Sequence, residues 1–73
     1  MKFPFIALHL ALEDGDNAPR ACYVKAEDII QVFVNGNDLP AICVKTGIDN
    51  TEEIEIYESV EEIMQKIQWY YQY

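Results

Sequence analysis

Basic residues are scarce in this sequence. Five lysines and arginines stand against thirteen aspartates and glutamates in 73 residues, which gives a formal net charge of −8. Such a balance repels the phosphates of nucleic acids and the surface of an anionic membrane. We therefore expect neither nucleic acid nor a membrane as a direct partner, and a protein with a basic surface as the natural complement.

Residues that carry chemistry are equally few. His9 is the only histidine, Ser59 is the only serine, and there are three glycines, too few for a phosphate-binding loop. Two cysteines with one distant histidine do not make a zinc pattern, and the acidic segment lacks the Asp-x-Asp-x-Asp-Gly spacing of a calcium loop. So short a chain also leaves little room for a substrate pocket. We expect no enzymatic activity, no catalytic residue, no metal site and no cofactor.

Long apolar runs are missing too. The longest near the start, Phe3–Leu12, is interrupted by a proline and a histidine and falls short of the roughly 18–20 residues of a membrane span. With a single lysine ahead of it, the run is also a poor signal peptide. We expect a cytoplasmic protein with residues 1–73 in one domain. Cys22 and Cys43 are then buried, reduced thiols; a disulfide between neighbouring strands is the less favoured alternative.

What the sequence does have is alternation of apolar and polar residues, which predicts strands. Turn-forming residues separate these segments, most clearly at Asn35-Gly36-Asn37-Asp38. The predicted strands are Phe3–Leu12, Ala21–Lys25, Ile29–Asn35, Ala41–Lys45 and Thr51–Tyr57, with a tight corner at Ala26-Glu27-Asp28.

The end of the chain reads as one amphipathic helix. Ser59 followed by Glu62 matches a capping box, which satisfies free backbone N–H groups at a helix start. Apolar residues then recur at three- and four-residue steps and predict one buried stripe, formed by Val60, Ile63, Met64, Ile67 and Tyr71. The expected fold is α+β: a small antiparallel sheet of four to five strands covered by one C-terminal helix.

Two segments carry a resemblance to known proteins. Val24-Lys25-Ala26-Glu27-Asp28-Ile29-Ile30, then a hairpin, and finally Ile54-Glu55-Ile56-Tyr57-Glu58-Ser59-Val60-Glu61-Glu62-Ile63 look like the small FlbD/YlzI-type bacterial proteins. They are also similar to small phage and bacterial proteins that end in a strand, an E-S-x-E-E-[IV] cap and one helix. The resemblance covers roughly residues 21 to 68, implies the same fold, and supplies no catalytic residue.

Two surfaces are candidates for binding a partner. Residues 49–62 contain seven acidic residues and no base, and an acidic face of this kind either solubilises the protein or engages a basic protein surface as an electrostatic decoy or clamp. The aromatic C-terminus either completes the core or anchors an interface. The predicted partner-binding residues are Glu52, Glu53, Glu55 and Glu58 in the first surface and Trp69, Tyr70 and Tyr73 in the second.

Two functions from different classes fit these features. The first is a small acidic interaction protein that binds and inhibits or modulates a larger machine, in the manner of phage host-takeover inhibitors of bacterial RNA polymerase or another nucleic-acid-handling complex. The second, implied by the flagellar-operon resemblance, is a structural or assembly accessory that self-associates through an edge strand or the aromatic tail. The sequence leaves monomer and homodimer both open.

Overall fold

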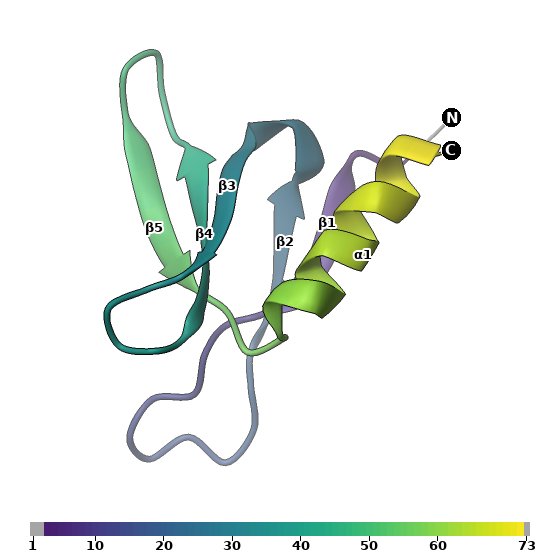
Figure 1. The fold of residues 1–73 in the computed structure, drawn as a ribbon. Coiled ribbons are helices and arrows are strands. Elements are labelled where there is room, and N and C mark those ends of the chain that lie inside the picture. Colours follow the sequence, from purple (N-terminus) through teal and green to yellow (C-terminus); the bar gives the residue numbers. More distant parts are fainter. Residues whose placement is uncertain (1–2, 73) are drawn as a thin grey trace.

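A computed structural model describes residues 3–72 as five strands followed by one long helix (Figure 1). The α+β prediction is confirmed, and most element boundaries fall within two residues of the predicted ones. The elements are β1 (Phe5–His9), β2 (Ala21–Lys25), a 3-10 turn η1 (Ala26–Asp28), β3 (Ile29–Val34), β4 (Pro40–Lys45), β5 (Thr51–Glu55) and α1 (Val60–Gln72).

The strands form two antiparallel sheets where we predicted one. β1 pairs with β2, while β3, β4 and β5 form a meander in that order. A short bridge joins the sheets, because the backbone continues past β1 and β5 and pairs Leu10 with Ile56. Two hydrogen bonds flank this bridge: Tyr57 N donates to His9 O (2.8 Å) and Ala11 N donates to Glu55 O (3.0 Å).

The core lies between the two sheets and the helix. Alternate residues of β1 and β4 point inward, as a period of two requires, and α1 packs against β1 and β3. Burying these apolar side chains is the main force that holds so small a domain together. The buried cluster is Ile6, Leu8, Ala26, Ile42, Val44, Ile56 and Ile63.

The buried face of α1 differs from the predicted stripe. Ile63 is fully buried, and Ile67 and Tyr70 pack against the core, whereas Met64 and Tyr71 are 50% and 60% exposed. The helix is therefore rotated toward Tyr70. Tyr70 also lies beside η1: burial, then the negative charge of Glu27, raise the pKa of Tyr70, with smaller contributions from Tyr71 and from a hydrogen bond to Glu27. Tyr70 thus gains a polar partner while its ring packs against the core.

The Ser59 half of the predicted capping box is present, whereas the Glu62 carboxylate meets the Ser59 hydroxyl and not its backbone N–H. Glu62 N donates to Ser59 Oγ at 3.1 Å, and Ile63 N donates to Ser59 O at 3.0 Å. The Glu62 carboxylate lies at the Ser59 hydroxyl, with 3.4 Å between Ser59 Oγ and Glu62 Oε1. Ser59 therefore fixes where α1 begins, directly after the segment that leaves β5.

Candidate functional site: an acidic strand

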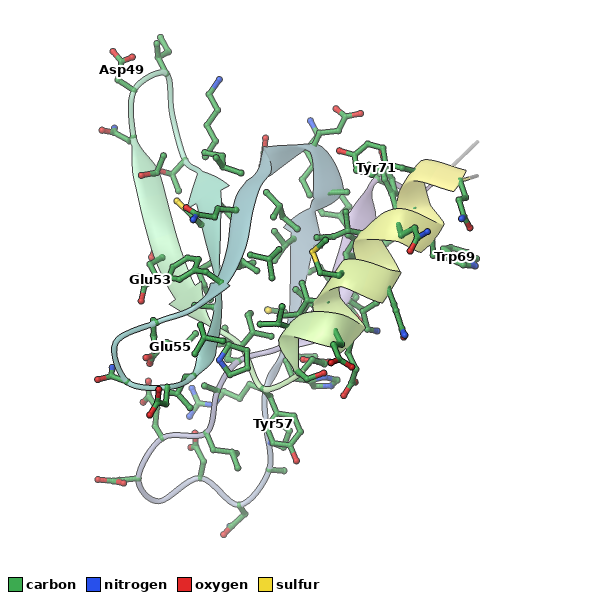
Figure 2. All side chains as sticks on the ribbon, viewed as in Figure 1. Asp49, Glu53, Glu55, Tyr57, Trp69 and Tyr71 are labelled. Atoms are coloured by element: carbon green, nitrogen blue, oxygen red, sulfur yellow. The ribbon has the colours of Figure 1, made fainter. Side chains whose placement is uncertain are left out.

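β5 carries two exposed acidic side chains, Glu52 and Glu53, and the half-buried Glu55. Ile54 and Ile56 turn toward the core, so Glu53 and Glu55 must point to the outer face of the meander. Glu52 precedes them at the exposed start of the strand, and Asp49 lies in the turn between β4 and β5. Figure 2 shows Asp49, Glu53 and Glu55 along one side of the molecule, on the far side of β5 from α1. We call Asp49, Glu52, Glu53 and Glu55 the acidic surface.

Two asparagines from the β3–β4 turn hold two members of this surface, Glu53 and Glu55, in place. Asn35 Nδ2 donates to Glu55 Oε2 (2.7 Å) and to Glu53 Oε2 (3.1 Å), and Asn37 Nδ2 donates to Glu55 Oε2 (3.1 Å). The hydrogen bonds from Asn37 and then Asn35 lower the pKa of Glu55, against a smaller opposing effect of burial. Glu55 therefore stays ionised at neutral pH, and its charge has a fixed position.

The turn that supplies these amides is itself well determined. Asn35 Oδ1 accepts hydrogen bonds from the backbone N–H of Asn37 (2.9 Å) and Leu39 (3.1 Å). Asp38 follows with a φ of 60°, a left-handed conformation that aspartate tolerates better than most residues. The sequence identified this turn from its Asn-Gly-Asn-Asp composition but gave no indication that its side chains reach across to β5.

Within residues 3–72, no basic side chain forms an ion pair with the acidic surface. Among residues 3–72, the ion pairs are Arg20 with Asp16 (3.7 Å) and His9 with Glu58 (2.8 Å), and neither involves this surface. Lys45 lies opposite Thr51 in the β4–β5 pair, but it makes no ion pair there. The negative charge is therefore uncompensated and available to a basic partner.

Glu58 does not belong to this surface, although we predicted it as a partner-binding residue. Its side chain is only 8% exposed, and its carboxylate accepts two hydrogen bonds from His9, from the backbone N to Oε1 and from Nδ1 to Oε2, both at 2.8 Å. Burial raises the pKa of Glu58, but the bonds from the His9 side chain and backbone outweigh it, so the net pKa is lowered. Glu58 thus ties the start of α1 to the end of β1.

The pairing of the Glu58 carboxylate with the His9 imidazole was not predicted. Neither Cys22 nor Ser59, the side chains near it that could act as a nucleophile, is activated by it. Burial, and then the charge of Glu58, raise the pKa of the Cys22 thiol, which keeps it protonated and unreactive at neutral pH. Ser59 is engaged in the helix cap. The sequence shows His9 on a strand and Glu58 just before the helix cap. Because the two residues are 49 positions apart, no local pattern indicates that they meet.

The aromatic tail separates into different environments. Trp69 is 65% exposed and, with the exposed Tyr71, lies on α1 at the opposite side of the molecule from β5 (Figure 2). Tyr70, predicted as a partner-binding residue, packs against the core instead, and Tyr71 meets its ring edge-on at 5.0 Å. Tyr73 lies outside the described residues. The predicted binding residues therefore belong to two separate surfaces.

The remaining observations concern metal sites, cysteines, membrane-spanning helices and similarity to known proteins. Within residues 3–72, no group of three or more His, Cys, Asp or Glu side chains is placed to hold a metal ion. Cys22 and Cys43 are free thiols, but both are half-buried and not buried as predicted. The helices in this range are too short or too polar to cross a membrane. No protein-family model, curated protein or solved structure matches the chain. The FlbD/YlzI-type resemblance therefore stays a prediction from the sequence.

Proposed function

We propose that this protein is a small, non-enzymatic, cytoplasmic interaction protein that binds a basic surface of a larger macromolecular machine and inhibits or modulates it. The observation that carries the proposal is the acidic surface on β5, where Asn35 and Asn37 hold Glu53 and Glu55 in fixed positions and no base pairs with them. Charges that are already positioned lose little side-chain freedom on binding, which favours affinity.

The partner class follows from the sign and density of charge. Proteins that handle nucleic acids present basic grooves to phosphates, and a chain with a net charge of −8 complements such a groove. Bacterial RNA polymerase is the example we favour, with other nucleic-acid-handling complexes next. The protein would then compete with nucleic acid for its partner without touching nucleic acid itself.

A pull-down from bacterial lysate tests the proposal. The tagged protein is incubated with lysate at about 50 mM and about 200 mM salt, a range over which charge-driven contacts weaken strongly, and the retained proteins are identified by mass spectrometry. We expect a nucleic-acid-handling complex that is retained at low salt and lost at high salt. The double variant Glu52→Gln/Glu53→Gln should lose it at both.

A matched control removes the same amount of charge elsewhere. Asp14→Asn/Glu61→Gln also neutralises two exposed carboxylates, but in the β1–β2 loop and the first turn of α1. This control should retain the partner at low salt. If the two double variants behave alike, or if binding is insensitive to salt, the acidic surface is not the binding site.

The second candidate is an assembly accessory that self-associates, and the exposed aromatics of α1 favour it. Trp69 and Tyr71 are 65% and 60% exposed on one helix, and large aromatic side chains are frequent anchors of interfaces. The same pull-down distinguishes the two functions. Recovery of only the protein itself, or of assembly components held equally at both salt concentrations, would support the accessory function.

A further inference from the structure

One edge of β5 has no neighbouring strand. Ile56 N donates to Pro40 O on the β4 side, while Glu55 O accepts from Ala11 N on the other side. The N–H and C=O groups of successive residues in a strand point to opposite edges. Thr51 and Glu53 therefore direct these groups the same way as Glu55, away from β4. Within residues 3–72, these backbone groups have no hydrogen-bond partner on that side. β5 lies at the margin of the meander in Figure 1, with no strand beside its first half.

The chain itself starts to fill this edge and then leaves it. The pairing of Leu10 with Ile56 is antiparallel, and extending that register by three residues would place Glu13 directly opposite Glu53. Two like charges at that spacing repel each other. The backbone instead turns away after Ala11, and Glu13 N donates to Asp16 Oδ2 at 3.1 Å in the following turn. The chain therefore leaves the space next to Thr51–Glu53 open, and a return of Glu13 to that position would bring two like charges together.

These charges also determine what can occupy the open edge. A second copy that paired β5 with β5 would bring glutamates of one chain against glutamates of the other, which disfavours self-pairing. A strand with basic side chains would instead be attracted. Glu53 lies on the outer face of the sheet and Glu52 on the inner face, so a basic side chain can pair with a glutamate on either face. Any two consecutive basic residues of an extended strand point to these two faces.

We propose that the open edge of β5 binds an extended basic segment of a partner protein as an added antiparallel strand. Consecutive Lys or Arg residues of that segment lie opposite Glu53 and Glu52, and a β-branched residue follows opposite Thr51. Glu53 and Thr51 each contribute one N–H and one C=O to the new ladder. This inference rests on the proposed function, because it specifies how the acidic surface recognises its partner.

The test uses the full chain and a synthetic probe, acetyl-Val-Lys-Arg-Val-Lys-Val-amide. Titration of the ¹⁵N-labelled protein with this peptide, followed by NMR, should shift the amide signals of Thr51 and Glu53 and slow their hydrogen exchange. A peptide of the same sequence that is N-methylated at the backbone nitrogens facing β5 keeps its charge but cannot donate. It should bind about fivefold to 150-fold more weakly, because the two hydrogen bonds donated by the peptide to Glu53 and Thr51 are both lost.

A pair of protein variants tests the backbone hydrogen bonds between β5 and the peptide by changing β5 instead of the peptide. Thr51→Pro removes the outward N–H without removing a bond to β4 and changes no charge, whereas Thr51→Val keeps the N–H and the β-branched shape. Thr51→Pro should weaken the peptide by about threefold to tenfold, and Thr51→Val by less than about twofold. The N-methylated peptide gives the answer independently if Thr51→Pro disturbs folding.

The outcomes separate this inference from the proposed function. If Glu52→Gln/Glu53→Gln abolishes binding while N-methylation and Thr51→Pro have no effect, the acidic surface binds basic partners through side chains alone, and the added strand is refuted. If neither charge nor backbone changes matter, both proposals fail. Loss of binding through both kinds of change, with shifts confined to β5 and its neighbours, supports the added strand.

Discussion

Replacing Ile63 and Met64 in turn measures how α1 sits on the sheets. Ile63 is fully buried and Met64, the next residue, is 50% exposed, although the periodicity of the sequence assigns both to the buried stripe. Ile63→Ala leaves a cavity and should lower the free energy of unfolding by about 2–5 kcal/mol. That is comparable with the roughly 3–5 kcal/mol expected from the single core of so short a chain. Ile63→Ala should therefore lose most of the stability of the wild type, and the midpoint of its unfolding should fall steeply.

Graded variants keep the comparison measurable. Ile63→Val removes one methylene and should cost about 0.5–1.5 kcal/mol, whereas Met64→Ala removes a half-exposed side chain and should cost about 1 kcal/mol or less. Ile63→Asp places a charge in the core and should abolish folding. Urea unfolding followed by circular dichroism gives these values from the shift of the midpoint at constant slope. A Met64→Ala cost equal to that of Ile63→Ala would refute the observed orientation of α1.

Two further predictions concern the start of α1. Ser59→Ala should lower the free energy of unfolding by about 1 kcal/mol in the same urea assay, and an unchanged midpoint would contradict the cap. Glu58→Gln should cost about 1–3 kcal/mol at pH 7, since a buried charged acceptor is lost. Because the folded-state pKa of Glu58 is lowered, its contribution is complete above its ordinary pKa and disappears as pH falls through the lowered one. The difference between wild type and Glu58→Gln should therefore vanish in strong acid; a difference that persists there would contradict an ionic role.

Local patterns were enough to locate the secondary structure. Alternation placed the strands because inward residues such as Ile42 and Val44 must share a face, and the Ser59–Glu62 spacing fixed the helix start. The division into two sheets was not accessible in this way. It depends on where the chain leaves β5 after Ala11, a pairing between segments more than forty positions apart in the sequence.

The orientation of α1 shows a second limit of local reasoning. Steps of three and four residues allow either Tyr70 or Tyr71 to continue the stripe after Ile67. In the structure Tyr70 packs against the core, where burial and then the charge of Glu27 in η1 raise its pKa. Glu27 lies more than forty positions away along the chain. Hydrophobic periodicity alone contains no information on such a partner.

The glutamates from β5 to α1 show that one residue type takes three roles according to its surroundings. Glu58 is buried and bonded to His9, so it stabilises the junction of β1 and α1. Glu55 is held by two asparagines, so its charge is positioned but satisfied. Glu52 is exposed beside the open edge of β5, where an added basic strand would meet it. The run of acidic residues in the sequence therefore overstates the surface we propose for binding, because Glu58 is buried and bonded to His9, whereas Glu52 and Glu53 are exposed.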